Sequence, residues 1–353
     1  MEKSNLIQFL SNAAIMAASI FIPIMAHEYG ATAFQIGLSV GIFFLTYFIA
    51  NYSFGVLADR ICLRRLVQTG LAVATVVFLA QMIITDLSAL FLFRALAGLA
   101  AGIFPAALAV YAFEERAGLM GKFNAYSSLG WAVGAVLAGL IGRYQQVFMM
   151  SAVFFAAAWL VSLNLKDVCP QQPSPLFPWR LVRKNLRIYV PYFFRAVGAQ
   201  SIWAIFPLYL MSIGADKFLI GVAFFVNLSA QFIMMQHIEK QKNLVLFNLG
   251  LLTSVITFII YAVANNYWVI LPVQLLLSYS FSALQVGSYQ ELLRVNREKG
   301  VTIGILNSIA NLNAFVGPFL AGVLLAYWGF PGVMWFAAGI TFVGLLSFTK
   351  VVK

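Results

Sequence analysis

Two arginines, Arg94 and Arg195, lie inside long apolar stretches of a chain in which only 9% of the 353 residues are charged. An ionisable side chain is costly to bury in such surroundings and usually belongs to a binding site or an ion pathway. No Asp or Glu lies deep within any of the apolar stretches. Because a guanidinium group can bind an oxyanion through two parallel hydrogen bonds, the two arginines favour an anionic ligand. In the structural alternative, each arginine bonds to backbone carbonyls or extends to the polar edge of its stretch.

The residues after Arg94 predict close helix packing. Arg94 opens the segment RALAGLAAG, in which Gly98 and Gly102 follow at i+4 and i+8. Small residues at this spacing share one helix face and let a neighbouring backbone approach. We therefore expect a second helix to lie against the glycine face beside Arg94.

Arg195 opens the segment RAVGAQSIW. Gly198 and Ala199, at i+3 and i+4, are predicted to leave open space on the arginine's own helix face, which a solute could fill. At about 100° per residue, Gln200 and Trp203 share a broad arc of the helix with the cation. The segment therefore predicts a substrate site made of a cation, an amide and an aromatic ring.

Uncharged polar residues within the apolar stretches are further candidates for substrate binding. Several stand one helical turn apart and so share a face, as Asn227 and Gln231 do. Side-chain amides also join helices to each other in lipid, at about 0.6–2 kcal/mol per bond, and that alternative stays open for all of them. The candidates are Asn12, Asn227, Gln231, Gln274, Asn307 and Asn311.

The composition predicts that membrane-spanning helices carry these residues. Hydrophobic residues make up 62% of the chain and the mean hydropathy is +0.91, outside the range of water-soluble globular domains. A span of about 20 apolar residues crosses a hydrocarbon core, as a helix or in a closed barrel, and the runs lack the alternating pattern of barrel strands. Twelve runs qualify, at 5–26, 34–54, 66–84, 88–112, 123–142, 146–165, 188–212, 218–236, 243–264, 267–290, 300–327 and 331–349.

The distribution of positive charge predicts the orientation of these spans. With the N-terminus inside, eighteen of the 22 Lys and Arg residues fall on the cytoplasmic side, and only Arg143 and Lys217 fall outside. Cationic loops are retained in the cytoplasm, so both termini are predicted to be cytoplasmic. The net charge of +11 then reflects topology and contact with anionic lipids rather than nucleic-acid binding.

The chain contains an internal repeat. Residues 21–37 align with 205–221 at an offset of 184, and 124–139 align with 307–322 at an offset of 183. Two halves of six spans follow, and because six is even both halves begin on the same side, as parallel repeats. The predicted organisation is an N-terminal six-helix bundle at 1–165, a cytoplasmic linker at 166–187 and a C-terminal six-helix bundle at 188–353.

The loop between the second and third spans reads GVLADRICLRR, residues 55–65. Together with twelve spans arranged as six plus six, it resembles the signature loop of the major facilitator superfamily of secondary transporters. The resemblance covers essentially the whole chain. It implies two bundles that rock about a central site near the bilayer midplane, so that the site opens to each side in turn.

The resemblance also implies a role for the charges of this loop. In the superfamily they latch the cytoplasmic side when the cavity opens outward, and the matching residues are Gly55, Asp59, Arg60 and Arg64, with Arg65 replacing a missing base. A carboxylate at a helix end can pair with nearby arginines and with the N-terminal end of a facing helix, and such contacts can form in one conformation and break in another. The alternative is a basic loop that only fixes topology.

We therefore expect a monomer in the cytoplasmic membrane that moves a small solute, an organic anion or a drug-like compound, with a coupling ion left open. A membrane-embedded enzyme is one alternative, but no nucleophile with a base, metal cluster or paired carboxylates stands out in the spans, so neither catalysis nor a cofactor is expected. A solute receptor without flux is the other. Cys62 and Cys169, both on the predicted cytoplasmic side, are expected to be reduced.

Overall fold

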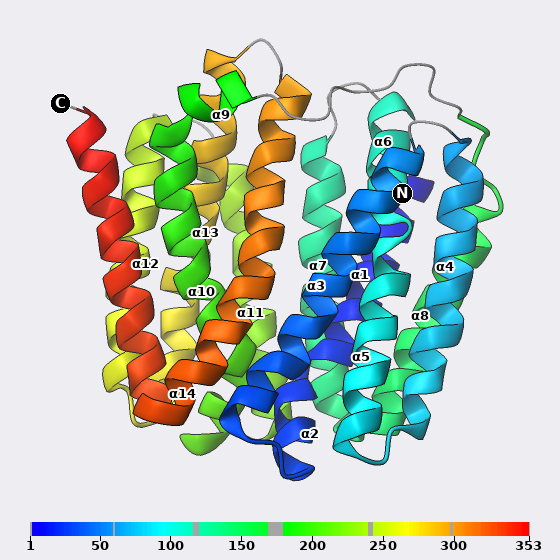
Figure 1. The fold of residues 1–353 in the computed structure, drawn as a ribbon, viewed down its shortest axis with the longest axis horizontal. Helices are drawn as coiled ribbons and strands as arrows, with labels where there is room; N and C mark the ends of the chain where they lie inside the picture. The colour runs from blue at the N-terminus through cyan, green and yellow to red at the C-terminus, as the bar shows by residue number, and fades with distance from the viewer. Residues whose placement is uncertain are drawn as a thin grey trace. The chain divides into compact units, whose positions relative to one another are not determined.

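The computed structural model contains helices throughout the described part of the chain (Figure 1). It describes residues 2–58, 61–115, 120–168, 179–238, 243–296 and 299–352. The helices are α1 (Lys3–Ile20), α2 (Ile22–Glu28), α3 (Ala33–Ala58), α4 (Leu63–Ala80), the short 3-10 helix η1 (Gln81–Ile83), α5 (Leu87–Gly102), α6 (Pro105–Glu115), α7 (Met120–Ile141), α8 (Tyr144–Ser162), α9 (Trp179–Lys184), α10 (Leu186–Ser212), α11 (Lys217–His237), α12 (Asn243–Val263), α13 (Tyr267–Val295) and α14 (Lys299–Val352).

The helices account for all twelve predicted spans. Ten stretches within the described residues are long and apolar enough to cross a membrane, and one of them, Ile305–Phe348, contains two predicted spans. Gly329 interrupts that stretch with φ 64° and ψ −168°, a left-handed conformation that glycine adopts without a Cβ clash. The predicted fifth span corresponds to a shorter apolar helix, Ala125–Ile141. The all-α, twelve-span fold class is confirmed.

The described residues form two compact units. Unit 1 comprises Met1–Ala31, Ile42–Ser174 and Asp216–Leu228. Within it α1 packs against α7 and α8, and α4 packs against α5 and α8. Lys3 Nζ donates to Asn164 O at 2.8 Å, so the start of α1 and the end of α8 lie at the same end of unit 1. An even number of spans predicts this.

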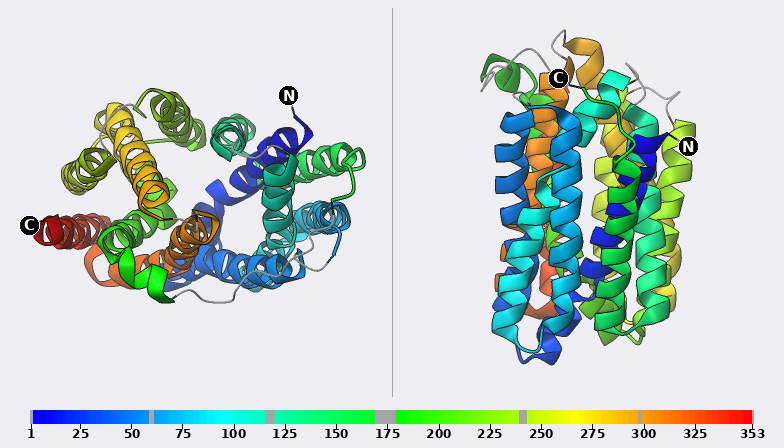
Figure 2. Two further views of the ribbon diagram at one scale, coloured as in Figure 1. Left: turned by 90° about the horizontal axis from the view of Figure 1, so that it is seen from above. Right: turned by 90° about the vertical axis from the view of Figure 1, so that its right-hand side faces the viewer.

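Unit 2 comprises Thr32–Gly41, Pro175–Ala215 and Ser229–Lys353. Within it α10 packs along α14, while α12 packs against α13 and α14. Lys184 Nζ donates to Val295 O at 3.0 Å, which joins the end of α9 to the end of α13. Figure 2 shows the helices within each unit running side by side.

Each unit includes a short segment from the other half of the sequence. In unit 2, the start of α3 lies against α14, where a Cβ on Gly37 would be 2.9 Å from Gly322 Cα. In unit 1, the start of α11 lies against α7, where a Cβ on Gly221 would be 3.2 Å from Gly139 Cα. The offset of 184 pairs Gly37 with Gly221 and the offset of 183 pairs Gly139 with Gly322, so the two contacts are equivalent under the repeat. The domain boundaries at 165 and 188 stay a prediction.

The expectation of reduced cysteines is wrong for Cys62, which is disulfide-bonded. The only other cysteine of the chain, Cys169, lies outside the described residues. Leu63 N donates to Val168 O at 2.9 Å, so the start of α4 lies beside the segment that follows α8. The expectation considered only the compartment and not this proximity in space.

Candidate functional site

Arg94 is held between two neighbouring helices of unit 1. Its helix, α5, begins after Asp86, whose carboxylate accepts a hydrogen bond from Ala89 N at 2.8 Å and caps the helix. Arg94 is 1% exposed, and its Nη1 donates to Ser19 Oγ on α1 at 3.3 Å. Its guanidinium carbon lies 4.3 Å from the centroid of the Phe43 ring on α3, a cation–π contact.

The close packing predicted beside Arg94 is confirmed. A Cβ on Gly98 would collide with Phe43 O on α3, and a Cβ on Gly102 would lie 2.6 Å from Tyr47 O. The two backbones therefore approach too closely for a side chain at either glycine. This approach places the Phe43 ring beside the guanidinium group.

Arg195 lies inside unit 2, on α10, and is 4% exposed. Its Nε donates to Ser254 Oγ on α12 at 3.0 Å. Ser254 is itself fixed, because its hydroxyl donates to Gly250 O at 2.7 Å and also contacts the hydroxyl of Ser280 on α13. The guanidinium carbon lies 5.6 Å from the centroid of the Phe281 ring. Two helices thus orient the arginine of a third.

The open space predicted at Gly198 and Ala199 is filled. A Cβ on Gly198 would lie 2.9 Å from Ala337 O, so the backbone of α14 occupies the position at i+3. Ala199, at i+4, is 3% exposed and lines a small apolar pocket. The prediction considered only the helix that carries Arg195, whereas α14 packs along this helix.

The cation, amide and ring predicted to act together on α10 have different neighbours. Arg195 contacts α12 and α13, as described above. Gln200 packs its Cβ and backbone against Gly317 on α14. Trp203 makes an edge-to-face contact with Phe206 at 5.5 Å between centroids. Trp203 also lines the small pocket, whose walls are Ala199, Ile202, Trp203, Phe206, Phe258, Tyr261 and Leu277.

Two of the predicted amides join structural elements to each other. Trp131 Nε1 on α7 donates to Asn12 Oδ1 on α1 at 2.6 Å. Gln274 Nε2 on α13 donates to the hydroxyl of Tyr261 on α12 at 2.8 Å. Both bonds fit the helix-joining alternative. Their aromatic partners carry no spacing signal that would have identified them in the sequence.

The remaining amides occupy different environments. Asn227 and Gln231 are buried on α11, and the hydroxyl of Ser282 approaches Gln231 O at 3.5 Å. Asn307 is exposed and accepts a hydrogen bond from the Tyr289 hydroxyl at 2.8 Å. Asn311 is half-buried.

The predicted latch is described only in part. Asp59 and Arg60 lie outside the described residues. Gly55 is half-buried on α3 and Arg65 is exposed on α4. Arg64 donates from Nη2 to Leu163 O at 3.0 Å and pairs with Asp167 at 3.6 Å. In this structure Arg64 therefore holds the segment that follows α8, inside its own unit.

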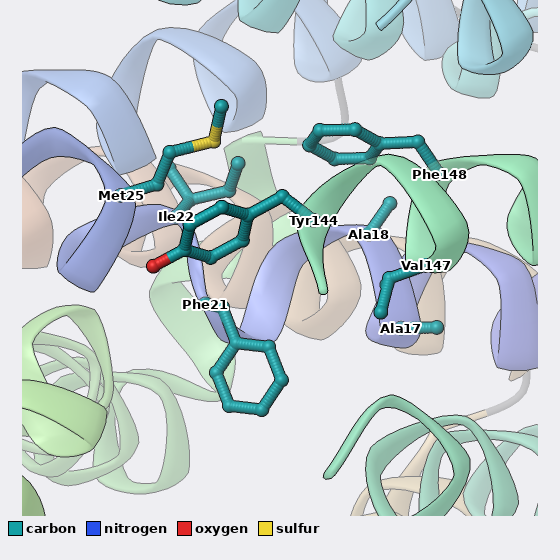
Figure 3. A pocket seen from close by; sticks show the side chains of 8 residues that line it. All are labelled: Ala17, Ala18, Phe21, Ile22, Met25, Tyr144, Val147 and Phe148. Atoms are coloured by element: carbon teal, nitrogen blue, oxygen red, sulfur yellow. The ribbon is translucent and has the colours of Figure 1, made fainter. Parts of the chain in front are cut away.

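A second apolar pocket lies in unit 1, where α1, α2 and α8 meet. Figure 3 shows the side chains that line it, which are apolar or aromatic. Beside this pocket, Lys217 Nζ lies 4.0 Å from the centroid of the Tyr144 ring and 3.8 Å from the carboxylate of Glu28. The nearby Tyr29 phenol has a raised pKa because of burial and the carboxylates of Glu28 and Asp86. The lining residues are Ala17, Ala18, Phe21, Ile22, Met25, Tyr144, Val147 and Phe148.

Comparison with known proteins identifies the family. Residues 5–293 match the Major Facilitator Superfamily. The chain belongs to this superfamily. It is accordingly a multi-pass membrane transporter and not an enzyme. The superfamily's small-solute transport agrees with the expectation from the loop at 55–65.

Two relatives of this superfamily member resemble it over most of its length. It is 25% identical to the multidrug resistance protein MdtG of Proteus mirabilis (strain HI4320), over 96% of this chain and 92% of that protein. It is 23% identical to the quinolone resistance protein NorA of Staphylococcus aureus (strain COL), over 86% of this chain and 84% of that protein.

Solved structures share the superfamily fold. A mutant of the nucleoside transporter NupG has a TM-score of 0.80 at 11% identity and covers 100% of both chains. A bacterial homologue of the human lysosomal transporter Spinster has a TM-score of 0.79 at 13% identity, over 99% of this chain and 95% of that one. At these identities the likeness establishes the fold alone.

Proposed function

We propose that this transporter moves small organic compounds of drug-like size, organic anions among them, across the cytoplasmic membrane by alternating access of two six-helix halves. The observation that carries the proposal is the burial of Arg94 and Arg195 in helices whose interiors contain no Asp or Glu. A buried cation loses its hydration, and a bound anion restores favourable electrostatics. The two arginines are the proposed charge contacts of the substrate.

The relatives support the drug-like size class. Their names refer to multidrug and quinolone resistance, and both align with most of this chain. Aromatic side chains beside Trp203 give this chain the surfaces on which planar organic compounds pack. Gln200, Trp203 and the amides Asn12, Asn227, Gln231, Gln274, Asn307 and Asn311 are the proposed uncharged contacts.

Flux in liposomes tests the proposal. Purified protein is reconstituted, and the movement of the anionic dye fluorescein and the cationic dye ethidium is followed with and without a pH gradient. We expect fluorescein flux above that of empty liposomes, and a loss of most of this flux in the double variant Arg94→Gln/Arg195→Gln. Arg180→Gln, at an exposed arginine of α9 outside the predicted latch, is the matched control and should keep the flux. Absence of flux for both dyes, or undiminished fluorescein flux in the double variant, would reject the proposal.

The latch is tested separately, because only part of it is described. Asp59→Asn should change both the flux and the proportion of inward-open and outward-open molecules, measured by labelling of cysteines introduced on each face. If Arg64 leaves Leu163 and Asp167 during the transport cycle, Arg64→Gln should change the flux and the labelling in the same direction as Asp59→Asn. Unchanged flux and labelling in both variants would leave the loop with topology as its only role.

A further inference from the structure

The guanidinium group of Arg195 uses only one of its edges. Nε donates to Ser254 Oγ at 3.0 Å, whereas Nη1 and Nη2 donate no hydrogen bond to any residue that the structure describes. The side chain is nevertheless 96% buried, since its exposed fraction is 4%. Buried donors without acceptors are strongly disfavoured. Neither terminal nitrogen of Arg195 is among the fully buried polar atoms without a partner in the described residues, so this edge keeps some exposure and an acceptor from outside the chain can reach its four N–H donors.

The neighbours of Arg195 fix the direction from which such an acceptor arrives. Ser254 occupies the Nε side, and the Phe281 ring lies 5.6 Å from the guanidinium carbon. The contact between Ser254 and Ser280 holds the serine hydroxyl in place across two helices. The hydrogen-bonding edge that remains is Nη1–Nη2, where two parallel donors match the two oxygens of a carboxylate that binds end-on. The edge is preorganised, which lowers the entropic cost of binding.

Polar side chains connect this site to one end of unit 2. Asn307 is exposed and accepts from the Tyr289 hydroxyl at 2.8 Å. Tyr289 and Gln285 are one turn apart on α13 and share a face, and Gln285 Oε1 accepts from the Tyr192 hydroxyl at 3.2 Å. Tyr192 lies three residues before Arg195 on α10 and so borders it. These four side chains provide hydrogen-bonding groups for a polar ligand between the exposed Asn307 and the buried Arg195.

We propose that Arg195 is the carboxylate-binding residue of the substrate site, that its Nη1–Nη2 edge binds the carboxylate end-on, and that Ser254 is a positioning residue that orients this edge. The inference rests on the function proposed above and narrows the anionic substrates to monocarboxylates. At the Nη1–Nη2 edge of Arg195, one guanidinium group neutralises one carboxylate, whereas a phosphate dianion bound at the same edge would keep a net negative charge there.

Protection against thermal unfolding tests this site without requiring transport. The probes are benzoate, its neutral analogue benzamide, and inorganic phosphate, each titrated against the protein in detergent at a pH at which phosphate is mainly the dianion. We expect benzoate to raise the midpoint of unfolding in a saturable way, and benzamide and phosphate to leave it unchanged. Arg195→Gln should abolish the benzoate effect. Ser254→Ala should weaken benzoate binding about three- to tenfold, the ratio expected for one hydrogen bond.

Two variants separate positioning from folding. Ser254→Thr keeps the hydroxyl and should restore benzoate binding. Ser201→Ala removes a buried serine that bonds only its own helix, at Val197 O, and should bind benzoate as the wild type does. Protection by phosphate equal to that by benzoate would overturn the carboxylate assignment, and unchanged protection in Arg195→Gln would overturn the site. Fluorescein flux without any benzoate protection would reject this inference alone, whereas absence of both would reject the proposed function as well.

Discussion

The surroundings of Arg94 and Arg195 differ in which edge of the arginine the protein uses. Arg94 directs Nη1 to Ser19 and lies 4.3 Å from the Phe43 ring. Arg195 directs Nε to Ser254 and lies 5.6 Å from the Phe281 ring. The protein therefore occupies part of the terminal edge in unit 1 and leaves this edge available in unit 2. Two arginines that are both buried can thus have different capacities to bind a ligand.

The repeat shows that the two arginines do not occupy equivalent positions. The offset of 184 pairs Arg195 with Ser11, whose hydroxyl donates to Ile7 O on its own helix at 2.8 Å. Arg94 aligns with Gln274 at an offset of 180, and Gln274 donates to Tyr261. Each half has a neutral polar residue where the other has its cation. The two halves of the sequence therefore differ in where they carry positive charge.

Substitutions that disturb the close packing of α3 and α5 beside Arg94 should have the largest effect on the midpoint of unfolding. Gly98→Ala places a Cβ against Phe43 O, whereas Gly198→Ala places one 2.9 Å from Ala337 O. Overpacking of this kind costs about 1–3 kcal/mol, so we expect lower unfolding midpoints in both variants and the larger loss in Gly98→Ala. Gly339→Ala is the matched control, because a Cβ there meets nothing within 4 Å. Equal midpoints in the three variants would contradict the packing around both arginines.

Replacing each arginine by an apolar residue should separate ligand binding from stability. The guanidinium group of Arg195 loses several kcal/mol of hydration, more than its contact with the Phe281 ring and its bond to Ser254 return, at about 0.5–2 kcal/mol each. Arg195→Met should therefore unfold at the wild-type temperature or above it, and Arg94→Met is the companion variant. Only Arg195→Met should lose all protection by benzoate. A clear fall in the midpoint of either variant would assign that arginine a structural role.

The sequence predicts those features that depend on one helix. The spans and the glycine face of Gly98 and Gly102 follow from apolar length and i, i+4 spacing, and the structure confirms both. The space beside Gly198 could not be predicted, because Ala337, which fills it, is more than a hundred residues away in the chain. Ser254 was not recognised either, since buried serines are common in apolar helices and their role depends on the neighbour that approaches them.

The hydrogen bond between Asn12 and Trp131 is another difference between the units, and its loss should change stability less. The offsets of the repeat place Ala196 and Ala314 at the equivalent positions of unit 2, so this bond has no counterpart there. Asn12→Ala and Trp131→Phe should each lower the free energy of unfolding by about 0.6–2 kcal/mol. The double variant should lose less than the sum, because both single changes break the same bond. Full additivity would show that the two residues stabilise the fold independently.

The smallest effect is expected at Lys217, a cation at the polar end of unit 1 that contrasts with both buried arginines. Its ammonium group lies 3.8 Å from the Glu28 carboxylate and 4.0 Å from the centroid of the Tyr144 ring. Partly exposed pairs contribute about 0–1 kcal/mol and are screened by salt. Lys217→Gln should therefore lower the unfolding midpoint slightly at low salt, and the difference from wild type should shrink at high salt. Benzoate protection, which depends on a cation shielded from solvent, should be unchanged in this variant. A loss of that protection would mean that surface charge, rather than the buried edge of Arg195, attracts the carboxylate.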